Sequence, residues 1–324
     1  MCGIVGYIGE EQAAPFLLNG LEKLEYRGYD SAGVAIYSED KLKVFKNKGR
    51  LAGLSDLIDG GKSLPGTIGI GHTRWATHGK PSIINSHPHV SQSGKFAVVH
   101  NGIIENYISL KNQLIDQGVK FSSETDTEVI VQLIEHYYEG NLMDAVMKTI
   151  SKIEGSYAFL VLSEEEKDKL IAVKKDNPLV IGVGKGEYFI ASDITAIISK
   201  TRDVIRLDDG ELAVIKKDEI NVYNFSGERL EKTPFYVDWD ISAAEKCGYD
   251  HFILKEIMEQ PKAIRDTINP RIKDGKIILD KFSLTKEEIE KISKICIVAC
   301  GSAYHVGCVA KYVFEKMLRK PVEV

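Results

Sequence analysis

The sequence has 324 residues, of which 44% are apolar and 27% charged, and its net charge of -5 is spread along the chain. This balance is typical of a globular protein, and the length suggests two domains at roughly 150 residues each. The chain has no basic stretch suited to nucleic acid, no run near about 18 apolar residues and no basic segment at its start. We therefore expect neither nucleic-acid nor membrane partners and no secretion signal. Five cysteines without CxxC pairs favour a reducing cytoplasm over disulfides or zinc.

Residues 1–225 show many short apolar segments and few helical ones. The expected strands, rich in Val, Ile and aromatic residues, are Ile4–Ile8, Gly33–Tyr37, Leu42–Lys46, Thr67–His72, Phe96–His100, Tyr157–Leu162, Leu170–Val173, Leu179–Val183, Tyr188–Ala191, Leu212–Ile215 and Ile220–Val222. The expected helices are Glu11–Leu24, Ile104–Gln117, Asp126–Tyr138 and Leu142–Ile153. Many strands with few interleaved helices do not suit a parallel α/β sheet, so two packed sheets covered by helices are expected.

The third helix carries a start signal. Thr125 is followed three residues later by Glu128, the spacing of a capping box. Asp126 would then lie in the first turn of this helix, where the helix dipole favours a negative charge.

A linker and a second domain are expected after residue 225. Residues 226–245 are polar and contain Pro234. The second domain is expected over residues 246–324, with a pattern that is helical again from Tyr249 and broken near Pro261. The apolar run Ile295–Cys300 ends at Gly301 and is followed by a helical stretch, Tyr304–Leu318. Strand, tight turn and helix open a doubly wound parallel sheet, where N–H groups at the helix start suit a phosphate. The sequence stops as a second strand would begin, so we expect this domain to be incomplete.

Cys2, directly after Met1, is the most informative residue. Removal of the initiator methionine would leave Cys2 with a thiol and a free α-amine, whose reference pKa values are about 8.5 and 7.7–8.0. The amine can therefore take the thiol's proton at neutral pH and activate it as a nucleophile. The alternative is a small buried hydrophobic residue at the start of a strand.

Five further segments follow Cys2-Gly3-Ile4-Val5-Gly6 in order. They are Glu25-Tyr26-Arg27-Gly28-Tyr29-Asp30-Ser31, Gly71-His72-Thr73-Arg74-Trp75-Ala76-Thr77-His78-Gly79, His100-Asn101-Gly102, Ser123-Glu124-Thr125-Asp126-Thr127-Glu128 and, after the linker, Ala299-Cys300-Gly301-Ser302. Together they resemble the class II glutamine amidotransferases, and the last resembles the start of a sugar-isomerase domain. The resemblance implies a four-layer αββα N-terminal-nucleophile hydrolase over residues 2–225, in an α+β chain.

The resemblance also implies a site. Cys2 would attack the amide of L-glutamine, and Arg74 would hold the substrate carboxylate, because its planar fork suits bidentate binding. Asp126 would hold the α-ammonium. The oxyanion hole would consist of Asn101 and Gly102, whose N–H groups stabilise a tetrahedral intermediate.

Thr77, His78 and Gly79 lie in what resembles the family's glutamine-covering loop. Trp75 resembles the residue that gates the passage of ammonia toward the isomerase site. Each assignment has a structural alternative: Arg74 as a surface residue at a strand end, Asn101-Gly102 as a turn, Trp75 as a core residue. Arg27 and Asp30 would either support the Cys2 end or form an ion pair within their turn.

The chemistry requires no metal or other cofactor. His72, His78, His87, His89 and His100 match no zinc-binding spacing. In the second domain, Ser302 matches a residue near a sugar phosphate, and Ala303 stands where relatives often carry another hydroxyl.

The acceptor and the state of the site leave alternatives. Members with a sugar-isomerase domain pass ammonia to fructose 6-phosphate, giving glucosamine 6-phosphate, and are usually homodimers. A phosphoribosyl-diphosphate amidotransferase would carry paired acidic residues before a small-residue loop, and an asparagine synthetase a Ser-Gly-Gly-x-Asp-Ser loop; neither is found. A binding module with an inactive Cys2 is the alternative from another functional class.

Overall fold

The computed structural model describes residues 2–238, 248–279 and 284–324. Contacts between Cα atoms divide the chain into two units, residues 1–245 and 246–324. No helix among the described residues is both long and apolar enough to cross a membrane.

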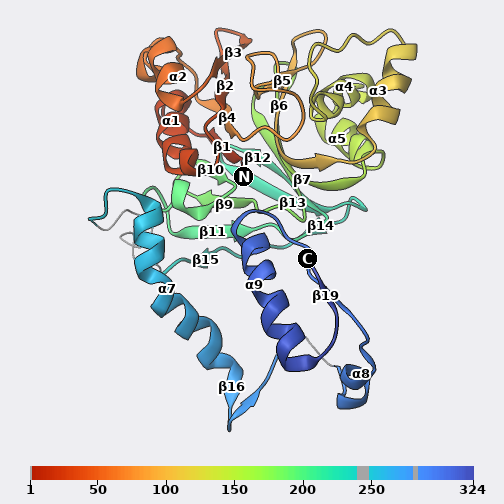
Figure 1. The fold of residues 1–324 in the computed structure, drawn as a ribbon. Coiled ribbons are helices and arrows are strands. Elements are labelled where there is room, and N and C mark those ends of the chain that lie inside the picture. The colour runs from red at the N-terminus through yellow and green to blue at the C-terminus, as the bar shows by residue number, and fades with distance from the viewer. Residues whose placement is uncertain (1, 239–247, 280–283) are drawn as a thin grey trace. The chain divides into compact units, whose positions relative to one another are not determined.

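The first unit contains two sheets, with antiparallel pairing between neighbouring strands (Figure 1). The eight-stranded sheet has the order β15-β11-β9-β10-β1-β4-β2-β3 and the seven-stranded sheet the order β14-β13-β12-β8-β7-β6-β5. Strands of the first sheet are β1 (Gly3–Ile8), β2 (Ser31–Ser38), β3 (Lys41–Lys48), β4 (Ile68–Arg74), β9 (Val180–Val183), β10 (Tyr188–Ala191), β11 (Asp203–Arg206) and β15 (Phe235–Tyr236). Strands of the second are β5 (His89–Val90), β6 (Phe96–Ile104), β7 (Gly155–Ser163), β8 (Lys169–Lys175), β12 (Glu211–Lys216), β13 (Glu219–Asn224) and β14 (Arg229–Leu230).

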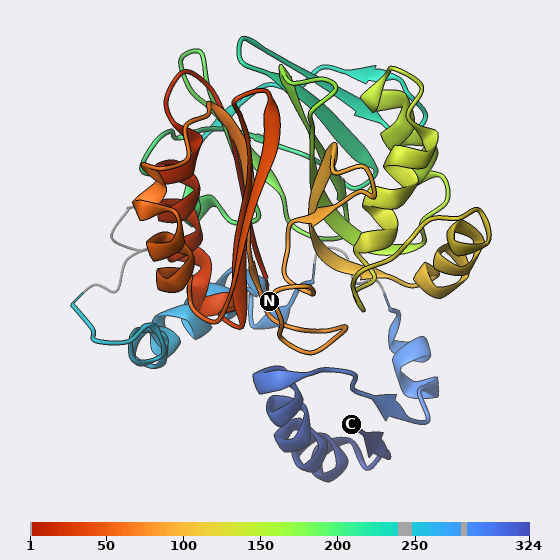
Figure 2. The ribbon, with the colours of Figure 1, turned by 90° about the horizontal axis from the view of Figure 1, so that it is seen from above.

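Helices cover the outer face of each sheet, as the view from above shows (Figure 2). Helices α1 (Ala13–Leu24) and α2 (Leu51–Leu57) lie on the first sheet, and α3 (Tyr107–Asp116), α4 (Glu128–Tyr137) and α5 (Leu142–Ile150) on the second. Short 3-10 turns are η1 (Glu25–Arg27), η2 (Asp59–Gly61) and η3 (Ile194–Ala196). The expected four-layer α+β sandwich is confirmed.

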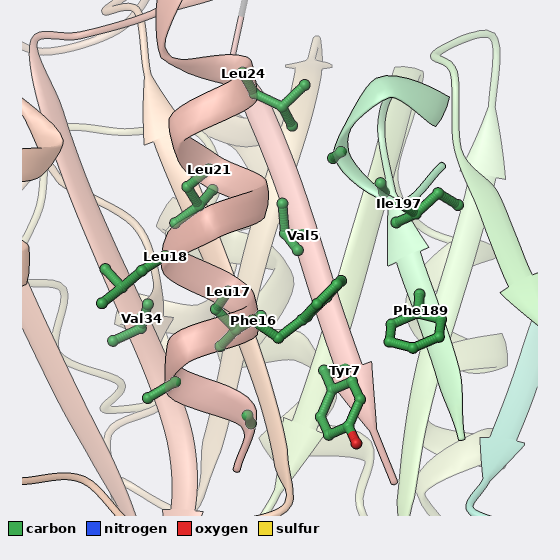
Figure 3. Close-up of a cluster of buried hydrophobic side chains, with 14 of the residues drawn as sticks. Val5, Tyr7, Phe16, Leu17, Leu18, Leu21, Leu24, Val34, Phe189 and Ile197 are labelled. Carbon is green, nitrogen blue, oxygen red and sulfur yellow. The ribbon is translucent and has the colours of Figure 1, made fainter. Parts of the chain in front are cut away.

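Strand alternation explains the layers. In β1, Ile4 and Ile8 belong to the core between the sheets, while Val5 and Tyr7 point to the opposite face, toward α1. Successive strand residues point to opposite faces, so one six-residue strand supplies two cores. Figure 3 shows the α1 side of this arrangement, where the helix places a run of apolar side chains over the sheet: Phe16, Leu17, Leu18, Leu21 and Leu24.

The same alternation builds the third core. In β6, Ala97 and Val99 face the first sheet, and Phe96 and Val98 face the helices α3–α5. Burial of each large apolar side chain stabilises the fold by about 1.5–3 kcal/mol. Since β1 likewise contributes side chains to two cores, Cys2 precedes a strand that is packed on both faces.

Several elements differ from the sequence predictions. The predicted capping box is wrong: α4 begins at Glu128, and its carboxylate accepts from the backbone N–H groups of Ser122 and Ser123, at 2.8 and 2.6 Å. The helix predicted from Ile104 begins at Tyr107, because β6 continues to Ile104. Helix α2 and strands β5 and β11 were not predicted.

Part of the predicted linker, residues 226–245, is strand. Arg229 pairs with Tyr223 of β13, and Phe235 pairs with Val204 of β11, so this segment adds an edge strand to each sheet. Residues 239–245 lie outside the described residues.

The second unit contains two long helices, α7 (Phe252–Ile268) and α9 (Gly301–Leu318), and several short elements. The short elements are η4 (Asn269–Arg271), β16 (Ile272–Lys273), β17 (Lys276–Ile277), α8 (Lys286–Lys291), β18 (Ile295–Cys296) and β19 (Val322–Glu323). Helix α7 runs through Pro261, so the helical break predicted there is wrong. Strand β19 pairs with β18 in parallel, which makes a strand–helix–strand unit around α9. The predicted strand Ile295–Cys300 is shorter in the structure, because among the described residues only β19 pairs with it, and this ladder is short.

Candidate active site

Cys2 lies just before β1, and its sulfur contacts the backbone at the end of β4. The Trp75 N–H donates to Cys2 Sγ at 3.2 Å, and Sγ lies 3.5 Å from the Trp75 carbonyl oxygen. Burial raises the pKa of the Cys2 thiol, and the hydrogen bond from Trp75 opposes this shift. The thiol therefore needs a base to become a nucleophile. Met1, and with it the expected removal of this residue, lies outside the described residues.

The turn before β2 holds the end of β4 in place. Asp30 N–H donates to the Arg74 carbonyl at 3.1 Å, and the Asp30 carboxylate accepts from Ala76 N–H. A Cβ at Gly28 would lie 2.9 Å from the Arg74 carbonyl carbon, so a glycine is needed for this close approach. The ion pair expected within this turn is wrong, because Arg27 pairs with Asp193.

Arg74, the last residue of β4, is buried with 3% of its surface exposed. Its Nη2 donates to the carbonyl oxygens of His78 and of Gly79, the latter at 2.9 Å, which ties the 75–79 loop to the strand. Its Nη1 is buried and has no hydrogen-bond partner among the described residues. A buried guanidinium donor without an acceptor is costly, so this atom is suited to receive a ligand carboxylate. The surface-residue alternative is wrong.

Asn101 and Gly102 lie inside β6, paired with β7, and not in the turn given as the alternative. Asn101 Nδ2 donates to the Cys2 carbonyl at 3.1 Å. Gly102 has φ 129°, and a Cβ there would lie 2.0 Å from the Ser156 carbonyl oxygen, so only glycine fits. The hydrogen bond from Asn101 to the Cys2 carbonyl joins the second sheet to the residue that carries the thiol.

Asp126 is buried and lies two residues before α4 begins, outside the helix's first turn. Its Oδ2 accepts from Ile104 N–H at 2.8 Å, and its Oδ1 lies 4.0 Å from His78 Nδ1. The carboxylate is therefore fixed by β6 rather than by the helix, which leaves one oxygen facing His78.

The other predicted loop residues are more open. His78 Nδ1 lies 3.4 Å from Thr77 Oγ1, and its ring meets Tyr107 edge-on with centroids 5.4 Å apart. Trp75 is 48% exposed and packs edge-on against Tyr29, so the core-residue alternative is wrong. The gating role of Trp75 stays a prediction.

Four histidines form a buried cluster beside this site: His72, His87, His89 and His100. Burial lowers the pKa of each, to about 3 for His72, so they are neutral at physiological pH. They bond to hydroxyl and amide groups, and within the described residues no group of three or more His, Cys, Asp or Glu side chains is placed to hold a metal.

Ser302 lies in the first turn of α9 in the second unit, and it is exposed. Its predicted contact with a sugar phosphate stays a prediction.

Sequence reasoning missed two contacts. His72 Nε2 lies 3.0 Å from Asn101 Oδ1, and Thr127 Oγ1 lies 2.9 Å from His100 Nδ1. The period of two along β4 places His72 on the same face as Arg74, but it does not indicate a contact with Asn101, which belongs to the other sheet.

Comparisons with known proteins agree with this fold. Residues 72–199 match the family model described as a glutamine amidotransferase domain. The solved glutamine phosphoribosylpyrophosphate amidotransferase from B. subtilis is similar, with a TM-score of 0.62 and 30% identity over 70% of this chain and 50% of that one. The allosteric regulatory enzyme of purine biosynthesis gives a TM-score of 0.61 and 31% identity, over 69% of this chain and 49% of that one. Residues 72–199 therefore match a glutamine amidotransferase domain, and the first unit has the N-terminal-nucleophile hydrolase fold of the class II glutamine amidotransferases.

Curated relatives extend the match to the whole chain. Proteins named glutamine–fructose-6-phosphate aminotransferase (isomerizing) are 57% identical in Caldanaerobacter subterraneus and 56% in Clostridium tetani, each over 100% of this chain and 53% of the relative's length. The one from Aquifex aeolicus is 50% identical over the same shares. The chain spans about half the length of the curated relatives it matches, and the family model, which ends at residue 199, does not test the sugar-isomerase prediction for residues 246–324.

Proposed function

We propose that this chain hydrolyses the side-chain amide of L-glutamine with Cys2 as the nucleophile. Cys2 Sγ attacks the amide carbon and the C–N bond breaks. The leaving NH2 group takes the proton given up by the thiol and departs as ammonia. The resulting γ-glutamyl thioester is then attacked by water, which releases glutamate and restores the thiol. The observation that carries the proposal is the hydrogen bond from Asn101 Nδ2 to the Cys2 carbonyl, since it brings an amide donor beside the sulfur-bearing residue.

The oxyanion would be stabilised by Asn101 and Gly102. Asn101 Nδ2 carries two hydrogens, of which one bonds to Cys2, and the second is available to a developing oxyanion. The Gly102 N–H would be the other donor. One donor of this kind typically lowers the barrier by about 2.7–4 kcal/mol.

Two opposite charges would hold the amino-acid end of glutamine. The unpartnered Arg74 Nη1 suits the α-carboxylate, and the Asp126 carboxylate suits the α-ammonium. Both side chains are buried, which strengthens their interaction with charged ligands. Thr77 and His78 would add contacts from the loop that Arg74 Nη2 ties down.

The base would be the α-amine of Cys2, freed by removal of Met1. Burial raises the thiol pKa, so the thiol forms little thiolate unaided. An adjacent amine with a reference pKa of about 7.7–8.0 is partly unprotonated near neutrality and would take the proton as the sulfur attacks. No metal or cofactor is needed for this chemistry.

In a longer protein, the ammonia would serve an acceptor. The names of the relatives favour fructose 6-phosphate, with glucosamine 6-phosphate as product and Trp75 as the gate toward the second site. On this proposal the complete protein takes part in amino-sugar biosynthesis in the cytoplasm, binds the sugar phosphate near Ser302 and forms a homodimer. A different acceptor is the second candidate, favoured by the 30% identity to a phosphoribosylpyrophosphate amidotransferase.

Incubation of the purified 324-residue chain with glutamine tests the proposal. We expect equal amounts of glutamate and ammonia, and no glucosamine 6-phosphate when fructose 6-phosphate is added. Asparagine, one methylene shorter, is the control substrate, and we expect little turnover because Arg74 and Asp126 fix the distance from the anchored end to Cys2. Tight binding of glutamine without turnover would instead identify an inactive binding module.

A further inference from the structure

One side chain of the buried histidine cluster, His72, contacts the site residue Asn101. His72 Nε2 lies 3.0 Å from Asn101 Oδ1 and 3.1 Å from the His100 carbonyl oxygen. His72 belongs to β4 and Asn101 to β6, so this contact crosses from one sheet to the other. We propose that His72 is the positioning residue that locks the Asn101 amide in the orientation needed for oxyanion stabilisation, an inference that rests on the proposed glutaminase function.

The hydrogen-bond partners fix the tautomer of His72. A backbone carbonyl oxygen only accepts, so the contact with the His100 carbonyl requires the hydrogen of His72 to be on Nε2. The same N–H then also points at Asn101 Oδ1. His72 Nδ1 is left as a buried lone pair without a partner among the described residues.

The Asn101 side-chain amide then has one allowed orientation. Oδ1 accepts from His72, and Nδ2 donates to the Cys2 carbonyl at 3.1 Å. A flipped amide would set Nδ2 against the His72 N–H and Oδ1 against the Cys2 carbonyl oxygen, which pairs two donors and two acceptors. Such unmade buried hydrogen bonds cost about 1–3 kcal/mol each, so the amide stays with its N–H groups toward Cys2.

The cluster keeps the His72 ring in place. Its ring stacks on His87, with centroids 4.1 Å apart and planes 15° apart. His87 Nδ1 accepts from His100 N–H at 3.2 Å, so His87 carries its hydrogen on Nε2, 3.4 Å from Thr127 Oγ1. The Thr127 hydroxyl can then donate to His100 Nδ1. This chain of neutral groups leaves little freedom for the donor that faces Asn101.

Two substitutions of matched chemistry separate positioning from packing. In His72→Gln the side-chain amide nitrogen can take the place of Nε2, whereas in His72→Asn it stands near the place of Nδ1 and cannot reach Asn101. We expect His72→Asn to lower kcat about 10- to 100-fold, less than the 10²–10³ typical of removing an oxyanion donor itself. We expect His72→Gln to retain most of kcat, with KM for glutamine nearly unchanged in both variants.

A double-mutant cycle with Asn101→Ala completes the test. If His72 acts through Asn101, His72→Asn changes kcat by less than about twofold once Asn101 is alanine. His89→Asn is the matched buried control: His89 bonds to Thr125 at 3.0 Å, so we expect a loss of stability and no comparable loss of kcat.

The inference is overturned if His72→Gln and His72→Asn lose kcat equally, if the loss falls on KM, or if the losses at His72 and Asn101 add. A wild-type chain that releases no glutamate contradicts the proposed function instead. The side-chain amide signal of Asn101 in an NMR spectrum then decides the contact. In His72→Asn we expect this signal to change position and to lose its protection from exchange. In His72→Gln we expect it to keep its position and its protection. An Asn101 signal that is the same in both variants contradicts the inference.

Discussion

Apolar side chains are buried in residues 2–238 but largely exposed in residues 248–279 and 284–324. In the first region, α1 buries Leu21 completely between helix and sheet (Figure 3). In the second, α9 leaves Val306, Tyr312 and Met317 exposed to 68%, 74% and 74%. A parallel strand–helix–strand unit is normally covered on both faces, which two short strands cannot achieve.

This difference in burial indicates which region can hold catalytic side chains in a fixed geometry. A catalytic geometry needs side chains held by surrounding packing, and Cys2, Arg74, Asn101 and Asp126 are all tied to strands or segments of the region with three cores. Ser302, in contrast, stands on a helix whose apolar residues remain exposed. We therefore expect the first region to act by itself and the second to depend on further chain or a partner for cover.

The largest effect is expected from removing the thiol. Cys2→Ala should lower glutamate release by at least about 10⁴-fold, as is found when a covalent nucleophile is removed. Cys300→Ala, a cysteine exposed in the second region, is the matched control and should leave the rate unchanged. A comparable loss in both variants, measured by coupled glutamate assay, would contradict the division between the regions.

The next largest effect is expected on stability, where a substitution in the first region should cost more than one in the second. Leu21→Ala removes a fully buried side chain and should lower the free energy of unfolding by about 2–5 kcal/mol. Leu318→Ala, at a position that is 50% exposed in α9, should change it by no more than about 0.5 kcal/mol. Urea denaturation of both variants measures this, and equal losses would mean that α9 is covered in solution.

Charge removal at Asp126 should act on substrate binding. Asp126→Asn keeps an oxygen for the Ile104 N–H but loses the charge that would face the substrate ammonium, so we expect kcat/KM to fall about 10²-fold, mostly through KM. Asp144→Asn, exposed on α5, is the control. A loss confined to kcat would assign Asp126 a role in the chemical step instead.

The smallest effect of a single substitution is expected in the pH dependence of stability. Burial lowers the pKa of His72, His87, His89 and His100, so below about pH 6.5 the unfolded chain binds protons that the folded chain does not. Stability is therefore full above this pH and falls on acidification, by up to about 1.4 kcal/mol per pH unit for each histidine. His89→Gln should make the decline between pH 6.5 and 5 less steep. Equal unfolding free energies at pH 7.5 and 5.5 would contradict the neutral, buried cluster.

The layers were predictable from the sequence for clear physical reasons, and the candidate site residues, whose roles stay predictions, lie in recognisable motifs. Alternation in Ile4–Ile8 and helical spacing in α1 are local, and the motifs around Cys2, Arg74 and Asn101 are contiguous. The contact between His72 and Asn101 was not predictable from either motif, because β4 and β6 lie in different sheets and meet only through the packing of layers. The capping box failed because the Glu128 carboxylate binds the Ser122 and Ser123 backbone, while the Thr125 hydroxyl bonds to His89 of the histidine cluster.

The central claim is that a freed Cys2 forms a covalent intermediate with glutamine. Mass spectrometry of the chain, quenched in acid during turnover and digested, tests it most directly. The account predicts a γ-glutamyl group on the peptide that begins at Cys2, with Met1 absent. A γ-glutamyl group on another residue, or normal turnover by protein that still begins with Met1, would contradict it.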